Sequence, residues 1–233
     1  MRTLLVPLVL GVVACGSPAQ AQNPSLIKPK GMVMPTDANK NKDLQRKAMV
    51  QFAECSLKSR RTSVMQYLAI FPGSQEAYKR MQSLADYDCI GAGYIRFTES
   101  LFRGAVYQTL YADTFRHEPV ADLKALASPD YAEGGNPASI SDGQEIALRR
   151  YSDCVVRADP KTAHELLVSS AGSPAEGEAF GTLTTSLSYC LAKGDTLKFS
   201  KSVLRGALAE VLYRIRSDAV PATASAQAPK SEG

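Results

Sequence analysis

The side chains best suited to chemistry in this chain are two histidines and five cysteines, and their spacing does not match a catalytic or metal motif. His117 is followed by Glu118 and Pro119, without the second histidine of a metalloprotease helix. His164 stands alone in an amphipathic stretch, and no Cys-x-x-Cys pair is present for a zinc site. Gly-x-Ser-x-Gly and glycine-rich phosphate loops do not occur either. We therefore predict no catalytic residue, metal or cofactor, and favour a non-enzymatic role while leaving activity open.

A long internal repeat identifies the elements that must position any site. Phe97–Tyr111 aligns with Phe199–Tyr213 at an offset of 102 residues (199 − 97), with Phe, Ser, Arg, Gly, Ala, Leu and Tyr recurring in place. A Gly-Ser pair at 73–74 recurs at 172–173, an offset of 99 (172 − 73). Chance explains such an ordered series poorly, so we interpret it as a tandem duplication.

The first residues resemble an export signal. Arg2 precedes an apolar stretch that ends at Ala14, and Ala19-Gln20-Ala21 forms a small-x-small cleavage site. Val12-Val13-Ala14-Cys15 resembles a bacterial lipobox, which would make Cys15 a lipidated first residue. We favour cleavage after Ala21 and a periplasmic or secreted protein. The alternative is an outer-membrane lipoprotein, which would contact the membrane through the lipid on Cys15.

Four cysteines remain in the predicted mature chain, and an even number in an oxidising compartment favours disulfides. Cys55 and Cys89 are 34 residues apart (89 − 55), and Cys154 and Cys190 are 36 apart (190 − 154). Because a single ancestral unit would have paired its own two cysteines, the duplication predicts the bonds Cys55–Cys89 and Cys154–Cys190.

Helical start signals and the lack of alternating strand patterns predict an all-α fold. Each half is expected to hold about four helices, stapled by its disulfide, with both halves packed as one bundle-like domain. In the first half we expect helices over 43–58, 62–71, 74–90 and 98–113. In the second, a Ser141/Gln144 capping box opens the first helix, and Asp159, Ser173 and either Asp195 or Thr196 open the next three.

These elements give the following predicted organisation: signal peptide 1–21, extended segment 22–42, helical repeat 43–113, linker 114–140, helical repeat 141–216 and disordered tail 217–233. The linker is rich in Pro and Gly and is expected to hold one short helix around 122–127. The tail has a composition that buries too little apolar surface to order itself.

The recurring Arg-Gly helix carries the candidate site residues. Glycine in a helix interior costs about 1 kcal/mol relative to alanine, so Gly104 and Gly206 predict a close crossing, with either the same helix of the other half or the first helix of their own. Arg103 and Arg205 have two interpretations. They form structural ion pairs with the acid before the first cysteine of their half, or they bind an anion where the halves meet. The acids are Glu54 and Asp153, and the tyrosines that would line the second site are Tyr111 and Tyr213.

The segment Leu204–Tyr213, which follows the Cys190 helix, resembles uncharacterised exported helical-repeat proteins of bacteria. The first half departs from this pattern at Ala105–Gln108. The resemblance implies an envelope location and carries no activity.

Charge and composition narrow the function class. The net charge is +4 over 233 residues, with acids and bases mixed through both halves, so a nucleic-acid surface is excluded. Export, duplication and disulfides together favour a cell-envelope protein that binds another envelope protein or has a structural role. The alternative is a helical bundle that binds a small apolar or anionic ligand between its halves. A histidine-dependent hydrolase is the third hypothesis.

Overall fold

The computed structural model describes residues 42–84, 89, 97–120, 122–192 and 199–219. Within these residues every regular element is a helix, which confirms the all-α prediction. The helices are α1 (Lys42–Leu68), α2 (Gln75–Ser83), α4 (Glu99–Phe115), α5 (Ile140–Ala158), α6 (Pro160–Val168), α7 (Pro174–Tyr189) and α8 (Lys201–Ala219). None of the described helices is both long enough and apolar enough to span a bilayer. The predicted signal peptide, Cys15, the predicted extended segment up to residue 41 and the predicted tail beyond 219 lie outside these residues. Residues 217–219, predicted to begin the disordered tail, are instead the end of α8.

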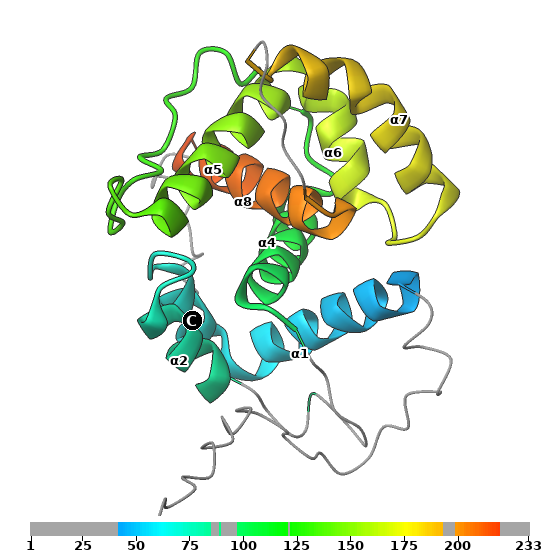
Figure 1. The fold of residues 1–233 in the computed structure, drawn as a ribbon. Helices are drawn as coiled ribbons and strands as arrows, with labels where there is room; N and C mark the ends of the chain where they lie inside the picture. Colours follow the sequence, from blue (N-terminus) through cyan, green and yellow to red (C-terminus); the bar gives the residue numbers. More distant parts are fainter. Residues whose placement is uncertain (1–41, 85–88, 90–96, 121, 193–198, 220–233) are drawn as a thin grey trace, which may run out of the picture.

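Helices α4 and α8 cross at the centre of the molecule, with α1 and α2 on one side and α5, α6 and α7 on the other (Figure 1). A Cβ atom placed on Gly104 would lie 2.7 Å from the Cα of Gly206, and the reciprocal distance is also 2.7 Å. Only glycine at both positions allows this approach. Of the two predicted partners, the structure selects the same helix of the other half.

The two halves use matching local geometry. Arg60 has non-helical dihedral angles inside α1 (φ −141°, ψ 40°), so the predicted break between 58 and 62 is a kink. Asp159 separates α5 from α6 at the corresponding place, with φ −144° and ψ 77°. Gly73 and Gly172 both have left-handed φ angles, 75° and 72°, a region that glycine adopts without a steric penalty.

Side-chain caps start four of the described helices. At α8 the Ser200 Oγ accepts from the Val203 amide at 3.3 Å, and the predicted starts Asp195 and Thr196 lie outside the described residues. The Oγ atoms of Ser74 and Ser173 accept from the amides of Ala77 and Glu176, and the Asp159 carboxylate caps α6. The predicted Ser141/Gln144 capping box is wrong, because Ser139 is the N-cap of α5 and Ser141 already lies inside the helix.

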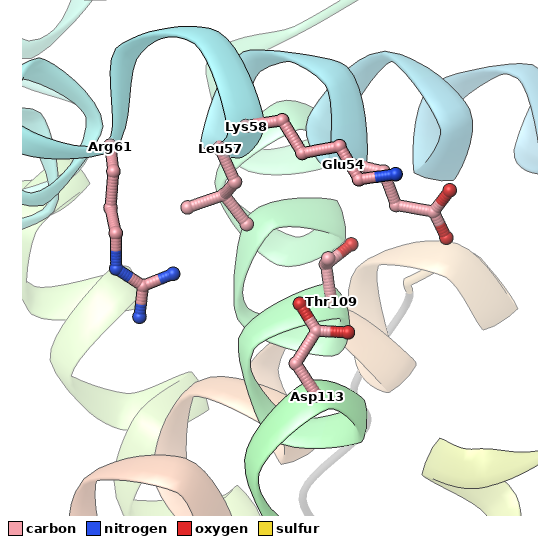
Figure 2. A pocket seen from close by; sticks show the side chains of 6 residues that line it. All are labelled: Glu54, Leu57, Lys58, Arg61, Thr109 and Asp113. Carbon is pink, nitrogen blue, oxygen red and sulfur yellow. The ribbon is translucent and has the colours of Figure 1, made fainter.

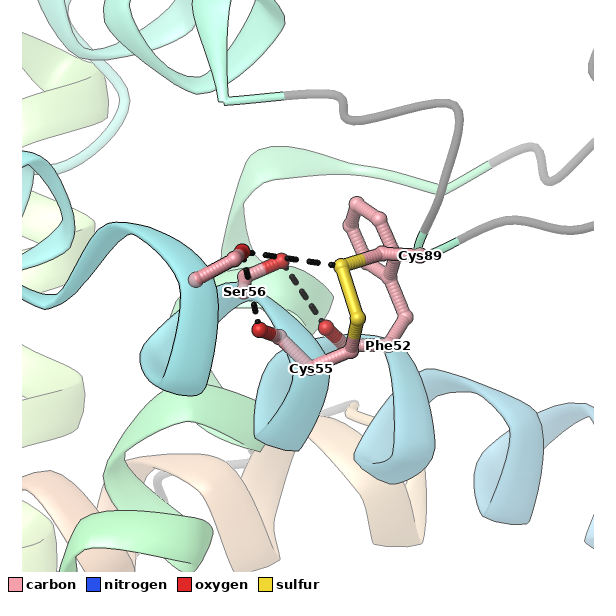
Figure 3. The surroundings of a disulfide bond; sticks show 5 residues. Phe52, Cys55, Ser56 and Cys89 are labelled. Carbon is pink, nitrogen blue, oxygen red and sulfur yellow. Dashed lines mark hydrogen bonds between the residues drawn. A yellow bond between two sulfur atoms is a disulfide. The ribbon is translucent and has the colours of Figure 1, made fainter.

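Both predicted disulfides are confirmed. Cys55–Cys89 joins α1 to the segment after α2, with Cα atoms 5.5 Å apart, and Cys154–Cys190 joins α5 to the end of α7 at 5.8 Å. Figure 3 shows the first bond beside Phe52, whose carbonyl oxygen accepts from Ser56 Oγ at 2.8 Å. Two disulfides fit an oxidising compartment outside the cytoplasm.

The segment between α4 and α5 contains turns, and the short helix predicted around 122–127 is wrong. One turn closes where the Leu126 amide donates to the Leu123 carbonyl. Arg157 of α5 then binds the carbonyl oxygens of both leucines, so these groups are satisfied without a continued helix. Leu123 is buried, and the segment lies against the second half.

Candidate functional site

The predicted binding arginines cap the ends of helices. Arg103 of α4 donates to the carbonyl oxygens of Leu68 (2.7 Å) and Ile70 (3.1 Å), where α1 ends. A helix terminus leaves carbonyl groups without amide partners and carries partial negative charge, and a guanidinium satisfies both. Arg103 is only 5% exposed, so these contacts use its donors inside the protein.

Arg205 of α8 makes the corresponding contacts in the second half. It donates to the carbonyl oxygens of Leu167 and Ser169, which stand 99 residues after the two acceptors of Arg103 (167 − 68, 169 − 70). Its carboxylate partner is Glu176, at 2.5 Å. Both arginines therefore hold the fold together, and neither presents a free guanidinium to a ligand.

The predicted ion pairs of these arginines with Glu54 and Asp153 are wrong. Arg103 pairs with Glu210 at 3.4 Å, and Asp153 pairs with Arg157 at 2.8 Å. The predicted pairs do not form because the arginine side chains extend toward the ends of α1 and α6. Glu54 and Asp153 lie on the bodies of α1 and α5.

Glu176, in the first turn of α7, is a buried anion. Arg46 of α1 binds both of its carboxylate oxygens, at 2.7 and 2.6 Å, and the Gly172 amide donates to it at 2.8 Å. Burial acts to raise its pKa, but these hydrogen bonds and that of Arg205 outweigh burial and hold the pKa below its ordinary value. No sequence pattern relates Arg46 to Glu176, because 130 residues separate them.

Glu210 is the second buried anion, on α8 between the two halves. Arg149 lies 3.0 Å from it and Arg103 3.4 Å, with Arg214 at 3.9 Å. Burial opposes its ionisation, and the three arginines hold its pKa below the ordinary value. The cluster ties α4, α5 and α8 together.

Tyr111 and Tyr213 also pack inside the molecule. Arg216 donates to the Tyr111 hydroxyl at 3.0 Å, and this hydroxyl lies 2.8 Å from His164 Nδ1. Arginine only donates, so the Tyr111 oxygen accepts the bond from Arg216. The Tyr213 ring packs against the Tyr107 ring, with centroids 5.9 Å apart and planes tilted by 53°.

Neither histidine belongs to a catalytic arrangement in the described parts of the chain. Burial, and then the nearby Arg216, lower the pKa of His164, so the imidazole stays neutral near pH 7. Its hydrogen-bond partner is a tyrosine, and no carboxylate orients it. His117 is exposed after the end of α4. Across the same residues, no group of three or more His, Cys, Asp or Glu side chains could hold a metal ion.

A surface hollow with a volume of about 360 Å³ lies between α1 and α4 and is a candidate site within the described residues. Its floor is formed by the buried side chains of Leu57 and Thr109. Four exposed charged residues surround the floor: Glu54, Lys58, Arg61 and Asp113. Figure 2 shows Glu54 and Lys58 projecting from one stretch of α1, Arg61 from beyond its kink, and Asp113 from α4.

The charged groups of this hollow have no ion-pair or hydrogen-bond partner among the described residues. The site holds two anions and two cations around a small apolar floor. A peptide segment with exposed polar groups and an apolar side chain would complement such a surface. The site lacks the concentration of charge of one sign that binding an inorganic anion or a metal ion would need. Only Glu54 was singled out from the sequence. The spacing of 54, 57 and 58 along one face of the predicted helix 43–58 was a usable signal. Nothing in the sequence relates these positions to Thr109 and Asp113 of α4.

Comparisons with protein-family models, with curated proteins and with solved structures found no match to this chain.

Proposed function

We propose that this chain is an exported, non-enzymatic binding protein of the cell envelope, in which a duplicated helical unit presents the α1/α4 hollow to a segment of a partner protein. Export is proposed from the N-terminal signal, and the two disulfides are consistent with it. No specific activity is part of the proposal.

Equivalent contacts in the two halves support the duplication. Each half has one disulfide between the same positions, one serine cap after a left-handed glycine, and one arginine that binds the end of a helix. The two glycines at the α4/α8 crossing contact each other reciprocally, as a pseudo-twofold axis requires.

The observation that carries the binding role is the contrast between buried and exposed charges. Buried arginines such as Arg103 and Arg205 are bound to carbonyl and carboxylate oxygens. The four charges around the hollow are unpaired within the described residues, and they surround a concave, partly apolar surface. A complementary chain would gain hydrogen bonds there without breaking internal ones.

A small-ligand site between the halves, the alternative hypothesis, has less support. The arginines that would line it are bound to backbone and carboxylate oxygens, and the Tyr111 hydroxyl is bound to Arg216 and His164. The two central helices also touch at Gly104 and Gly206.

Site-specific photo-crosslinking tests the proposal. A photoreactive residue at position 58 in the exported protein should give one discrete adduct with an envelope protein. The same residue at Lys161, whose side chain is 80% exposed on α6, is the matched control. Identical adduct patterns at the two positions, or no adduct at 58, would contradict a binding surface at the hollow.

A further inference from the structure

The second half contains a counterpart of the hollow, and in that half it is filled. An offset of 99 relates Glu54 to Asp153 and Lys58 to Arg157. An offset of 102 relates the α4 side, Thr109 and Asp113, to Val211 and Ile215 of α8. The corresponding surface therefore lies between α5 and α8.

The chain's own linker occupies that surface. Arg157 donates to the carbonyl oxygens of Leu123 and Leu126, and Asp153 accepts from Ser128 Oγ at 2.6 Å. Arg157 and Asp153 also pair with each other. Farther along, Arg216 of α8 donates to the Pro119 carbonyl at 3.0 Å. The acid and the base at these two positions are thus used to hold a non-helical peptide.

The same surface in the first half keeps the acid and the base but has no described segment over it. Lys58 stands where Arg157 binds two carbonyl oxygens, and Glu54 stands where Asp153 accepts from a hydroxyl. Leu57 takes the place of Val156 in the floor. These three positions retain the chemistry found at the peptide-holding positions of the other half, whereas on the α4 side the polar Thr109 and Asp113 stand in place of the apolar Val211 and Ile215.

We propose that the α1/α4 hollow binds a non-helical peptide segment of a partner protein in the way that α5 and α8 bind residues 119–128. Such a segment has a leucine pair spaced like Leu123 and Leu126, a hydroxyl two residues later, and carbonyl oxygens that accept from Lys58. This inference rests on the proposed function and gives the chemistry of the partner.

The pseudo-twofold also offers a segment of the chain itself, the residues after α8. At the offset of 102, Pro221 aligns with Pro119, but Ser225 and Ala228 stand where the linker has Leu123 and Leu126. The tail sequence therefore lacks the apolar side chains, and this favours a separate partner.

A synthetic peptide of residues 119–131 is the probe for this proposal. Titrated by calorimetry into the full mature, disulfide-intact protein, it should bind in the micromolar range. A peptide with serine in place of both leucines should not bind. Lys58→Ala should weaken binding about tenfold or more, because one charge-assisted hydrogen bond contributes about 1.5–3 kcal/mol. Lys161→Ala is the control and should leave binding unchanged.

Lys58→Arg supplies a sharper test. It should bind the peptide at least as tightly as the parent protein, since arginine can reach two carbonyl oxygens as Arg157 does. Each variant should keep the parent's unfolding midpoint, which shows that the change is at the exposed side chain.

The failures are distinguishable. If the peptide does not bind, or binds equally to Lys58→Ala, the inferred chemistry is wrong, and a specific crosslink at position 58 would then leave only the proposed function standing. If the peptide does not bind and no specific crosslink forms at position 58, both this inference and the proposed function are wrong. A peptide of residues 220–233 that binds more tightly than the linker peptide would make the chain's own tail the occupant and overturn the partner assignment.

Discussion

Arg205 lies where α6 ends, with its guanidinium bound to Glu176 and to the carbonyl oxygens of Leu167 and Ser169. A buried charge is costly unless it is paired and hydrogen-bonded, and this one has both kinds of partner. The same is true of Arg103 in the first half. At the residue scale, stability therefore depends on arginine side chains that donate to the unpaired carbonyl oxygens at helix ends.

Arg205→Ala should lower the free energy of unfolding by about 3–5 kcal/mol, because it leaves two carbonyl groups unsatisfied and removes one of the cations bound to Glu176. Arg205→Lys should recover only part of this loss, since an ammonium lacks the planar fork. Urea denaturation measures both. The exposed control Lys161→Ala should stay within about 0.5 kcal/mol of the parent, and a similar small effect for Arg205→Ala would contradict the helix-end role.

Glu176 predicts a dependence of stability on pH. Its pKa in the folded protein lies below the ordinary value of 4.5. Its contribution is therefore complete above pH 4.5 and is lost as the pH falls through the folded pKa. Glu176→Gln should be most destabilised, relative to the parent, at pH 7, and the difference should shrink by pH 3. Urea unfolding at pH 7, 5 and 3 tests this, and a difference that grows on acidification would refute it.

At the scale of elements, the crossing of α4 and α8 determines how the halves meet. The approach is close because Gly104 and Gly206 face each other without side chains. Sequence periodicity placed both glycines on a packing face and anticipated a close crossing. Periodicity left two partner helices possible, the same helix of the other half or the first helix of the same half. A packing face indicates that another helix is near, but it does not identify that helix.

Gly104→Ala should destabilise the protein by roughly 1–3 kcal/mol, although alanine favours helices, because the added methyl group would meet backbone atoms that must move apart. Gly181→Ala in α7 is the matched control. Nothing lies within 4 Å of a Cβ at this position, so the change should stabilise by roughly 0.5–1 kcal/mol. Thermal or urea unfolding measures the direction of both stability changes. Equal effects of the two substitutions would mean that the close α4/α8 contact does not determine the effect at Gly104.

For the molecule as a whole, one disulfide closes each half. Loops of 34 and 36 residues each restrict the unfolded chain by about 3–4 kcal/mol on the entropic description of cross-links. One bond ties α1 to the segment after α2, and the other ties α5 to the end of α7. The bonds therefore hold the outer helices of each half to one another.

Replacing Cys154 and Cys190 together with alanine should lower the free energy of unfolding by about 2–5 kcal/mol. Reduction of the parent protein should have an effect at least as large, because it opens both bonds. Unchanged stability after reduction would contradict the stabilising role of the disulfides.

Intact mass of the exported protein, with and without reductant, should show two disulfides. The same measurement distinguishes cleavage after Ala21 from lipidation at Cys15.

The sequence by itself determined the helical class, both disulfides and the close glycine crossing, since periodicity, cap residues and recurring cysteines are local or repeated signals. It did not determine the partners of Arg103 and Arg205, because an arginine can reach several oxygens and the direction of its side chain depends on the final packing. The pairing of Arg46 with Glu176 and the hollow between α1 and α4 likewise depend on residues far apart in the chain. Only the tertiary structure showed that the linker covers one of two corresponding surfaces, because the contacts of Arg157 and Asp153 with residues 123–128 depend on how the chain folds back.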